Sequence, residues 1–345
     1  MPQHPERVTR MPDSNSHAFD FTTFLADKEA WSAPNELVPY RCRDGSSLGC
    51  RHYHPTRIPA STTHLILLHG SSADSRYLAS LATHLATEGY HVHTPDLRGH
   101  GPTPARRGDI DHPLQLEEDL EDLIRSLDLP ADASLWIAGH SAGGGLALRF
   151  AASALEHGLA GIPLAGLILL APYLDHLAPN MRRDSRWAQP RIARMLTCML
   201  LNKLSIHRLD HLEVVTFNIP AEYRDANTTS AYSWRLMTGL NPRHYQRDLE
   251  TLSRHHVPLL ALIGDQDEAF HADRLEECLQ PQHPAAHVTI LEDVDHLGLA
   301  TATVTAERIA EWLTRHQTSR LATRAKRSIK SRRGSTSSPI RVLNI

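Results

Sequence analysis

A single serine between glycines stands in the run LWIAGHSAGGGLAL, residues 135–148. The run passes from apolar residues that favour a buried strand, through GHSAG, into a second apolar stretch that favours a helix. A sharp strand-to-helix turn exposes a serine hydroxyl, and flanking glycines remove the Cβ clashes that such a turn creates. Helix N-terminal N–H groups can then stabilise an anionic intermediate. The pattern predicts Ser141 as a nucleophile; on this stretch alone, a packing turn without chemistry stays open.

Two later stretches carry the side chains that a serine nucleophile needs. In LEDVDHLGL, His296 follows an apolar run and precedes a helical pattern, so its imidazole could take the serine proton and return it to a leaving group. In ALIGDQDEAF, Asp265 and Asp267 follow a predicted strand, and either carboxylate could hold that imidazole in the required tautomer. The alternatives are a surface histidine, because the chain has 24 histidines, and aspartates that cap a helix or face solvent.

The loop in LLHGSSADSRY supplies a further candidate. An apolar run ends there at a His-Gly pair, and small residues lead into a helical pattern. The N–H groups of Ser71 and Ala142 are therefore predicted to form the oxyanion hole of an acyl-transfer site. An ordinary strand–helix loop is the alternative for Ser71.

The order of these residues strengthens the interpretation. Ser141, an acidic residue and His296 follow one another, each at the C-terminal end of a predicted strand. In sheets of this kind these ends lie at one edge, where sites form. Three individually weak signals thus converge on one catalytic triad.

Eight strand-like runs alternate with helical patterns and must position these residues. A hairpin signal around Asp44-Gly45 opens the series, and the later apolar runs are nearly continuous, as expected for strands covered on both faces. This alternation predicts an α/β fold with an eight-stranded, mostly parallel sheet flanked by helices. The runs occupy residues 37–55 (two runs), 63–70, 90–96, the first part of 135–148, 165–172, 257–265 and 287–293.

Segments outside this alternation divide the chain. Residues 1–34 are polar and contain prolines, which predicts a flexible leader before the α/β domain of residues 35–316. Residues from about 175 to 250 break the rhythm between two core strands and include helix-like pieces, so they are predicted to be an inserted helical cap. Residues 317–345 are rich in Ser, Arg and Lys with few large apolar residues, which predicts a basic disordered tail.

Composition adds few constraints. A formal net charge of −3 over 345 residues gives no overall bias toward nucleic acid, and no specific nucleic-acid binding is expected. The N-terminus lacks an apolar signal-peptide core, and the longest uncharged run, 158–174, is short for a membrane span, so a cytoplasmic location is expected. The cysteines form no CxxC or metal-ligand pattern and are expected to be free thiols, although Cys42 and Cys50 could face each other across the predicted hairpin. They are Cys42, Cys50, Cys198 and Cys278.

Together these motifs resemble the α/β-hydrolase superfamily, and within it the monoacylglycerol lipase, lysophospholipase and serine aminopeptidase S33 branch. The resemblance covers roughly residues 37–316, except most of the cap. The motifs that carry it are RDGSSLGCRHY, HGSSADSRY, TPDLRGHGPTPARRGDI, GHSAGGGLAL, LILLAPYL, GDQDE and DVDH.

By position, the resemblance implies Ser141 as nucleophile, Asp267 as acid and His296 as base. Asp267 is preferred to Asp265 because the family's acid stands three residues after the strand-ending glycine, here Gly264. The resemblance further implies hydrolysis of a carboxylic ester through an acyl-enzyme, without metal or organic cofactor, by a monoacylglycerol- or lysophospholipid-type lipase or esterase. A thioesterase, amidase or peptidase would use the same triad. A non-catalytic binding protein on this fold would show a damaged one.

The cap and the tail suggest two further hypotheses. An apolar stripe in the cap could line a channel for an acyl chain, or could instead pack the cap onto the core. The candidate substrate contacts are Met199, Phe217, Tyr232 and Trp234. The basic tail could touch anionic lipid, at about 1 kcal/mol per charge near a membrane, or could be a solvated tail without a partner. The expected partner is a small-molecule or lipid ester.

Overall fold

The computed structural model describes residue 19 and residues 35–57, 61–102, 106–158 and 164–317. The predicted leader, apart from Phe19, and the predicted basic tail after residue 317 lie outside the described residues. No helix within the described ranges is both long and apolar enough to cross a lipid bilayer.

An eight-stranded sheet forms the centre of the protein, as predicted, in the order β1-β2-β4-β3-β5-β6-β10-β11. The pairs β1/β2 and β2/β4 are antiparallel, and all other neighbours in this sheet are parallel. The strands are β1 (Leu37–Arg41), β2 (Ser47–Tyr53), β3 (Thr63–Leu68), β4 (His91–Pro95), β5 (Ser134–His140), β6 (Leu164–Leu170), β10 (Leu259–Gly264) and β11 (His287–Leu291).

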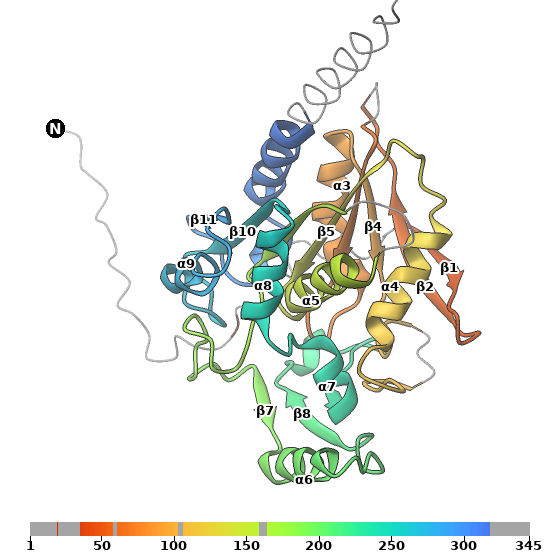
Figure 1. Ribbon diagram of the computed structural model, residues 1–345, viewed down its shortest axis with the longest axis vertical. Coiled ribbons are helices and arrows are strands. Elements are labelled where there is room, and N and C mark those ends of the chain that lie inside the picture. The colour runs from red at the N-terminus through yellow and green to blue at the C-terminus, as the bar shows by residue number, and fades with distance from the viewer. Residues whose placement is uncertain (1–18, 20–34, 58–60, 103–105, 159–163, 318–345) are drawn as a thin grey trace, which may run out of the picture.

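The central strands are buried on both faces, which explains their continuous apolar sequences. Every residue of β3 and β10 is buried, and only the first residue of β5 and of β6 is partly exposed. Parallel strands need helical crossovers, and these helices cover both faces of the sheet. In Figure 1, α4 (Gln115–Ser126), α5 (Ala142–His157) and α8 (Tyr245–Arg254) lie in front of the sheet. The hydroxyl of Tyr90, just before β4, binds the helix of residues 303–317.

The segment between β6 and β10 differs from the predicted helical cap. It contains a three-stranded antiparallel sheet, ordered β7-β8-β9, in addition to α6 and α7. These strands are only three to five residues long, too short for alternation to show in the sequence. Before residue 250 the chain has already begun α8, which packs on α5. The elements are β7 (Ala188–Pro190), α6 (Ile192–Lys203), β8 (Glu213–Phe217), η2 (Ala221–Tyr223), β9 (Ala231–Ser233) and α7 (Trp234–Leu240).

We call residues 175–244 of this segment the insertion. In Figure 1 it lies below the main sheet, with β7 and β8 leading down to α6 as the outermost element. The insertion therefore covers one edge of the sheet and leaves the helical layers on its faces undisturbed.

Candidate active site

Ser141 lies on a strained turn between β5 and α5. Its backbone has φ 54° and ψ −120°, in a region that residues with a Cβ rarely adopt. The turn brings backbones so close together that glycine is needed on both sides. A Cβ on Gly139 would lie 2.1 Å from the carbonyl oxygen of Gly143, and a Cβ on Gly143 would lie 2.4 Å from that of His69. The glycines in the sequence pattern thus serve close approach.

A buried histidine–carboxylate pair stands near this turn. Nδ1 of His296 lies 2.7 Å from Oδ2 of Asp267, and the two residues are 2% and 1% exposed. The other carboxylate oxygen accepts the N–H groups of Ala269 and Phe270 at 2.8 and 2.7 Å. Because an ionised carboxylate only accepts, Nδ1 of His296 carries a hydrogen and Nε2 of the neutral ring is a base. Asp265, the other candidate acid, is exposed to solvent.

The surroundings of His296 favour its protonated form. Burial by itself lowers the pKa of the imidazole, but the carboxylate of Asp267, with smaller contributions from Glu268 and Asp295, outweighs burial and raises it. The ring is thereby tuned to accept a proton and to hold it as a stabilised cation.

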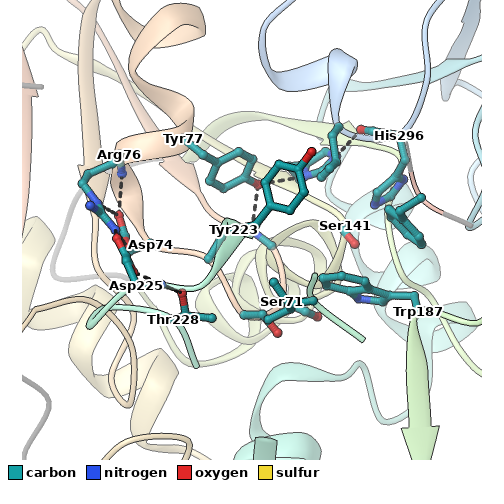
Figure 2. A pocket seen from close by; sticks show the side chains of 17 residues that line it. Ser71, Asp74, Arg76, Tyr77, Ser141, Trp187, Tyr223, Asp225, Thr228 and His296 are labelled. Atoms are coloured by element: carbon teal, nitrogen blue, oxygen red, sulfur yellow. Dashed lines mark hydrogen bonds and ion pairs between the residues drawn. The ribbon is translucent and has the colours of Figure 1, made fainter. Parts of the chain in front are cut away.

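Ser141 and His296 line the same pocket, which has about 760 Å³ of empty volume, counting the solvent at its open mouth. Figure 2 shows Ser141, His296 and Trp187 at one end and the ion-paired Arg76, Asp74 and Asp225 at the other. Between the ends, most of the wall is aromatic or small. The lining residues are Phe19, Gly70, Ser71, Ser72, Ala73, Asp74, Arg76, Tyr77, His140, Ser141, Trp187, Ile219, Tyr223, Asp225, Thr228, His296 and Leu297.

The two N–H groups predicted for the oxyanion hole come from neighbouring strand ends. Ser71 follows β3 and lines the pocket, and Ala142 is the first residue of α5. Among the hydrogen bonds of the described residues, none uses the N–H of Ser71 or of Ala142. Both donors are therefore available to a ligand atom beside Ser141.

The structure does not bring the four predicted substrate contacts of the insertion into this pocket. Met199 lies on α6 and is 38% exposed, while Trp234 begins α7 outside the pocket lining. Phe217 and Tyr232 are buried and pack edge to face, with ring centroids 4.7 Å apart. Helical spacing identifies the apolar face that carries Met199 without indicating what that face contacts, and Phe217 and Tyr232 lie on short strands.

The insertion supplies other pocket residues that the sequence analysis missed. Trp187, Ile219 and Tyr223 line the pocket, and the Trp187 ring lies 5.5 Å from that of Phe217 behind it. Phe19 also contributes, with its ring 5.2 Å from that of His296. The only sequence signal for these positions is a set of large apolar residues in irregular segments.

No group of three or more His, Cys, Asp or Glu side chains in the described ranges is arranged to hold a metal ion. The four cysteines are buried and free.

A family model described as serine aminopeptidase, S33 (Hydrolase_4) matches residues 59–297. The chain belongs to this hydrolase family. A search of curated proteins by sequence finds no match.

Solved structures show the same fold at low sequence identity. A soluble variant of monoglyceride lipase from Saccharomyces cerevisiae, in complex with a substrate analogue, superposes with a TM-score of 0.63 at 17% identity, over 82% of this chain and 96% of the lipase. The α/β hydrolase GrgF from Penicillium sp. sh18 gives 0.60 at 17% identity, over 82% and 99%. A putative aryl esterase from Burkholderia cenocepacia gives 0.58 at 18% identity, over 82% and 100%. The protein therefore has the α/β-hydrolase fold.

Proposed function

We propose that the protein is a serine hydrolase that cleaves carboxylic esters through an acyl-enzyme. Ser141 Oγ attacks the ester carbonyl while Nε2 of His296 takes the hydroxyl proton, and Asp267 stabilises the imidazolium. The N–H groups of Ser71 and Ala142 bind the oxyanion. His296 then protonates the leaving alcohol, and a water molecule, deprotonated by the same imidazole, releases the acid.

One observation carries this proposal. A serine in a strained left-handed conformation shares an open pocket with the buried Asp267–His296 pair. Backbone strain persists only where the surrounding structure holds it, and it concentrates at functional sites. A turn that merely packed a helix on a strand would not need a buried histidine–carboxylate pair beside it.

A second observation favours lipid esters among the possible substrates. The outer face of α6 and the turn after it expose large apolar side chains, and residues 185–209 contain five Lys or Arg and no Asp or Glu. An exposed apolar helix face with basic residues on and around the helix suits contact with a lipid surface. The exposed residues are Ile192, Leu196, Met199, Leu200, Leu204 and Ile206. This supports a substrate of the monoacylglycerol or lysophospholipid type, taken from a lipid aggregate.

Labelling tests the nucleophile directly. A fluorophosphonate probe should modify the wild-type protein at Ser141, as identified by mass spectrometry of the labelled peptide. Ser141→Ala should lose the label and lose kcat on p-nitrophenyl butyrate by a factor of about 10⁴ or more. Ser153→Ala, on the opposite end of the same helix, serves as the matched control and should retain both. Labelling elsewhere, or an active Ser141→Ala variant, would refute the assignment.

A substrate panel tests the bond type. Among matched esters, thioesters and amino-acid anilides with the same acyl group, the ester should be cleaved fastest. If the substrate is of the proposed type, monoacylglycerols should be cleaved faster than triacylglycerols. A preference for the anilides would instead favour a peptidase with the same triad.

A further inference from the structure

Two tyrosine hydroxyls hold the loop after β3 on either side of Ser71. The N–H of Gly70 donates to the hydroxyl of Tyr77 over 2.8 Å. The N–H of Ser72 donates to the hydroxyl of Tyr232, also over 2.8 Å. The N–H of Ser71 lies between these two and has no partner among the described hydrogen bonds. Hydrogen bonds therefore hold the residues on both sides of Ser71, the predicted oxyanion donor.

The first tyrosine is oriented by the residue before the nucleophile. Nε2 of His140 lies 2.9 Å from the carbonyl oxygen of His296, so this nitrogen must carry a hydrogen. Burial lowers the pKa of His140 well below its usual value, so the ring is neutral and its Nδ1 accepts. The hydroxyl of Tyr77, 2.7 Å from Nδ1, must donate to it and accept from Gly70. One directed chain therefore links the loop after β3, the nucleophile turn and the loop of His296.

The second tyrosine is oriented in the same way by another buried histidine. Nδ1 of His100 lies 3.1 Å from the carbonyl oxygen of Arg98 and donates to it. Burial lowers the pKa of His100 well below its usual value, so the ring is neutral and Nε2 accepts the Tyr232 hydroxyl hydrogen over 2.7 Å. The Tyr232 oxygen is then left to accept the N–H of Ser72. The direction of each hydrogen bond is fixed by a backbone carbonyl at its far end.

Ser72 is held on its carbonyl side as well. The N–H of Thr229 donates to the Ser72 carbonyl over 3.2 Å. Ser72 has φ 68°, a left-handed conformation that needs such support in a residue other than glycine. Thr229 and Tyr232 both belong to the insertion. The insertion therefore supports the conformation of a distant loop, since Ser72 and Tyr232 are 160 residues apart in the chain.

We propose that Tyr77 and Tyr232 are positioning residues that fix the direction of the Ser71 N–H toward the oxyanion of the reaction. The inference rests on the proposed function. Its physical basis is an asymmetry between the two donors: the α5 helix fixes the N–H of Ala142, but no regular element fixes that of Ser71. A donor stabilises a developing charge only when it is already aimed at it. The two hydroxyls supply that orientation, and neither touches the substrate carbonyl.

Removing one hydroxyl at a time tests the proposal. The variants Tyr77→Phe and Tyr232→Phe each delete a single oxygen. Tyr90→Phe is the matched control, because its buried hydroxyl also makes two hydrogen bonds, to Ala310 and Thr314, away from the pocket. Active sites are counted by fluorophosphonate labelling, so that a misfolded fraction does not enter the rates.

A trifluoromethyl ketone separates positioning from structural support. It adds to the serine to form a hemiketal oxyanion, whereas the matching secondary alcohol binds without one. In both tyrosine variants we expect kcat per labelled site to fall and the ketone inhibition constant to rise by the same factor, about 10- to 100-fold. This is less than the roughly 10²–10³-fold cost of deleting an oxyanion donor outright. KM and the alcohol inhibition constant should stay within about twofold.

Three outcomes would overturn the inference. In the first, kcat falls but the ketone inhibition constant does not change. In the second, kcat per labelled site is that of the wild type and only the number of labelled sites falls. In the third, kcat in the two tyrosine variants falls no further than in Tyr90→Phe. The ketone reports on the oxyanion whichever acyl bond the enzyme cleaves. A wild-type protein that binds the ketone but cleaves no carboxylic ester would therefore refute the proposed function and leave this test standing.

Discussion

Oδ2 of Asp267 lies 2.7 Å from Nδ1 of His296, and both side chains are withdrawn from solvent. In Asp267→Asn, the side-chain amide can donate to Nδ1, which moves the ring hydrogen to Nε2 and removes the base. We expect kcat on a soluble ester to fall by about 10³–10⁴, with the fold retained. Asp265→Asn is the control, because Asp265 is exposed at the same turn, and its kcat should change less than twofold. Equal losses in both variants would contradict the assignment of the acid.

The pH dependence of hydrolysis should follow the protonation of His296. The carboxylates near it outweigh burial and raise its pKa above 6.5, and only the neutral ring accepts the serine proton. We therefore expect kcat/KM to be constant at high pH, to reach half its maximum at a pH above 6.5, and to fall tenfold per unit below that. In Asp267→Asn the midpoint should move to lower pH, since burial is then opposed by fewer charges. A wild-type midpoint below 6 would count against this environment.

The apolar face of α6 should matter only for aggregated substrates. Leu196 and Leu200 are 50% and 58% exposed one helical turn apart, and neither lines the pocket. The double variant Leu196→Gln/Leu200→Gln should lose about tenfold or more in activity on anionic vesicles that contain monoacylglycerol, through lost interfacial binding. Its kcat/KM on p-nitrophenyl butyrate below its solubility limit should be unchanged. Ile290→Gln removes an exposed apolar group on β11 and should affect neither assay. Equal losses on both substrates would argue for a packing role.

Arg149 should be among the most costly residues to truncate. Its Nε lies 2.5 Å from a carboxylate oxygen of Glu117, and its Nη1 donates to the carbonyls of Thr238 and Gly239. Burial raises the pKa of Glu117 to about 7 even beside Arg149. At a pH above that value, Arg149→Met leaves a buried carboxylate without its partner, which typically costs about 3–5 kcal/mol of the free energy of unfolding. Adding Glu117→Gln should recover part of that loss, because the remaining side chain is uncharged. Urea unfolding of the two single variants and the double variant checks this; strictly additive losses would contradict the pairing.

Histidines on β2, β3 and β4 should make the fold sensitive to acid. Nδ1 of His52 lies 2.8 Å from Nδ1 of His93, whose Nε2 lies 3.1 Å from Nδ1 of His64. Burial and neighbouring histidines lower the pKa of His64 to about 4 and that of His93 well below 6.5. Below pH 6.5 the unfolded chain therefore binds more protons than the folded one, and stability decreases as the pH falls toward 4.

The slope of the free energy of unfolding against pH measures this loss of stability. In His64→Leu, the free energy of unfolding should fall less steeply between pH 6 and 4.5, by up to about 1.4 kcal/mol per pH unit for the proton no longer taken up. His176→Gln, whose side chain is exposed, should keep the wild-type slope. An unchanged slope in His64→Leu would mean that the cluster is already protonated when folded.

The central sheet could be predicted from the sequence because burial on both faces leaves a direct trace. The strands ending at Leu68, His140 and Gly264 are mostly apolar in sequence, and Ser71, Ser141 and Asp267 follow their ends within three residues. Strand ends at one edge of a parallel sheet are brought together by the topology alone. The prediction of Ser141, Asp267 and His296 as one group needed no knowledge of side-chain contacts.

The pocket wall could not be predicted in this way. Trp187 and Tyr223 lie in irregular or very short elements, where no periodicity reports which side faces inward. The sequence offers Tyr232 only as a candidate substrate contact in the cap, with packing onto the core as the alternative. Its hydroxyl instead meets Ser72, and a pairing over that sequence distance depends on how the insertion folds back. Local patterns carry no information about such a contact.

Thr229 and Tyr232 hold Ser72 by hydrogen bonds to its carbonyl and its N–H. These two contacts limit which sequences can replace the insertion, in engineering or in evolution. Segments inserted at a sheet edge are usually the parts that accept exchange most freely. Here the outer helix, α6, could be replaced to change what the protein adheres to. The strand that carries Tyr232 could not be replaced with it, unless the substitute brings a hydroxyl to the same place. The insertion thus has an outer part, α6, that can be exchanged, and an inner part that supports the oxyanion loop. A chimaera should therefore be joined between these two parts.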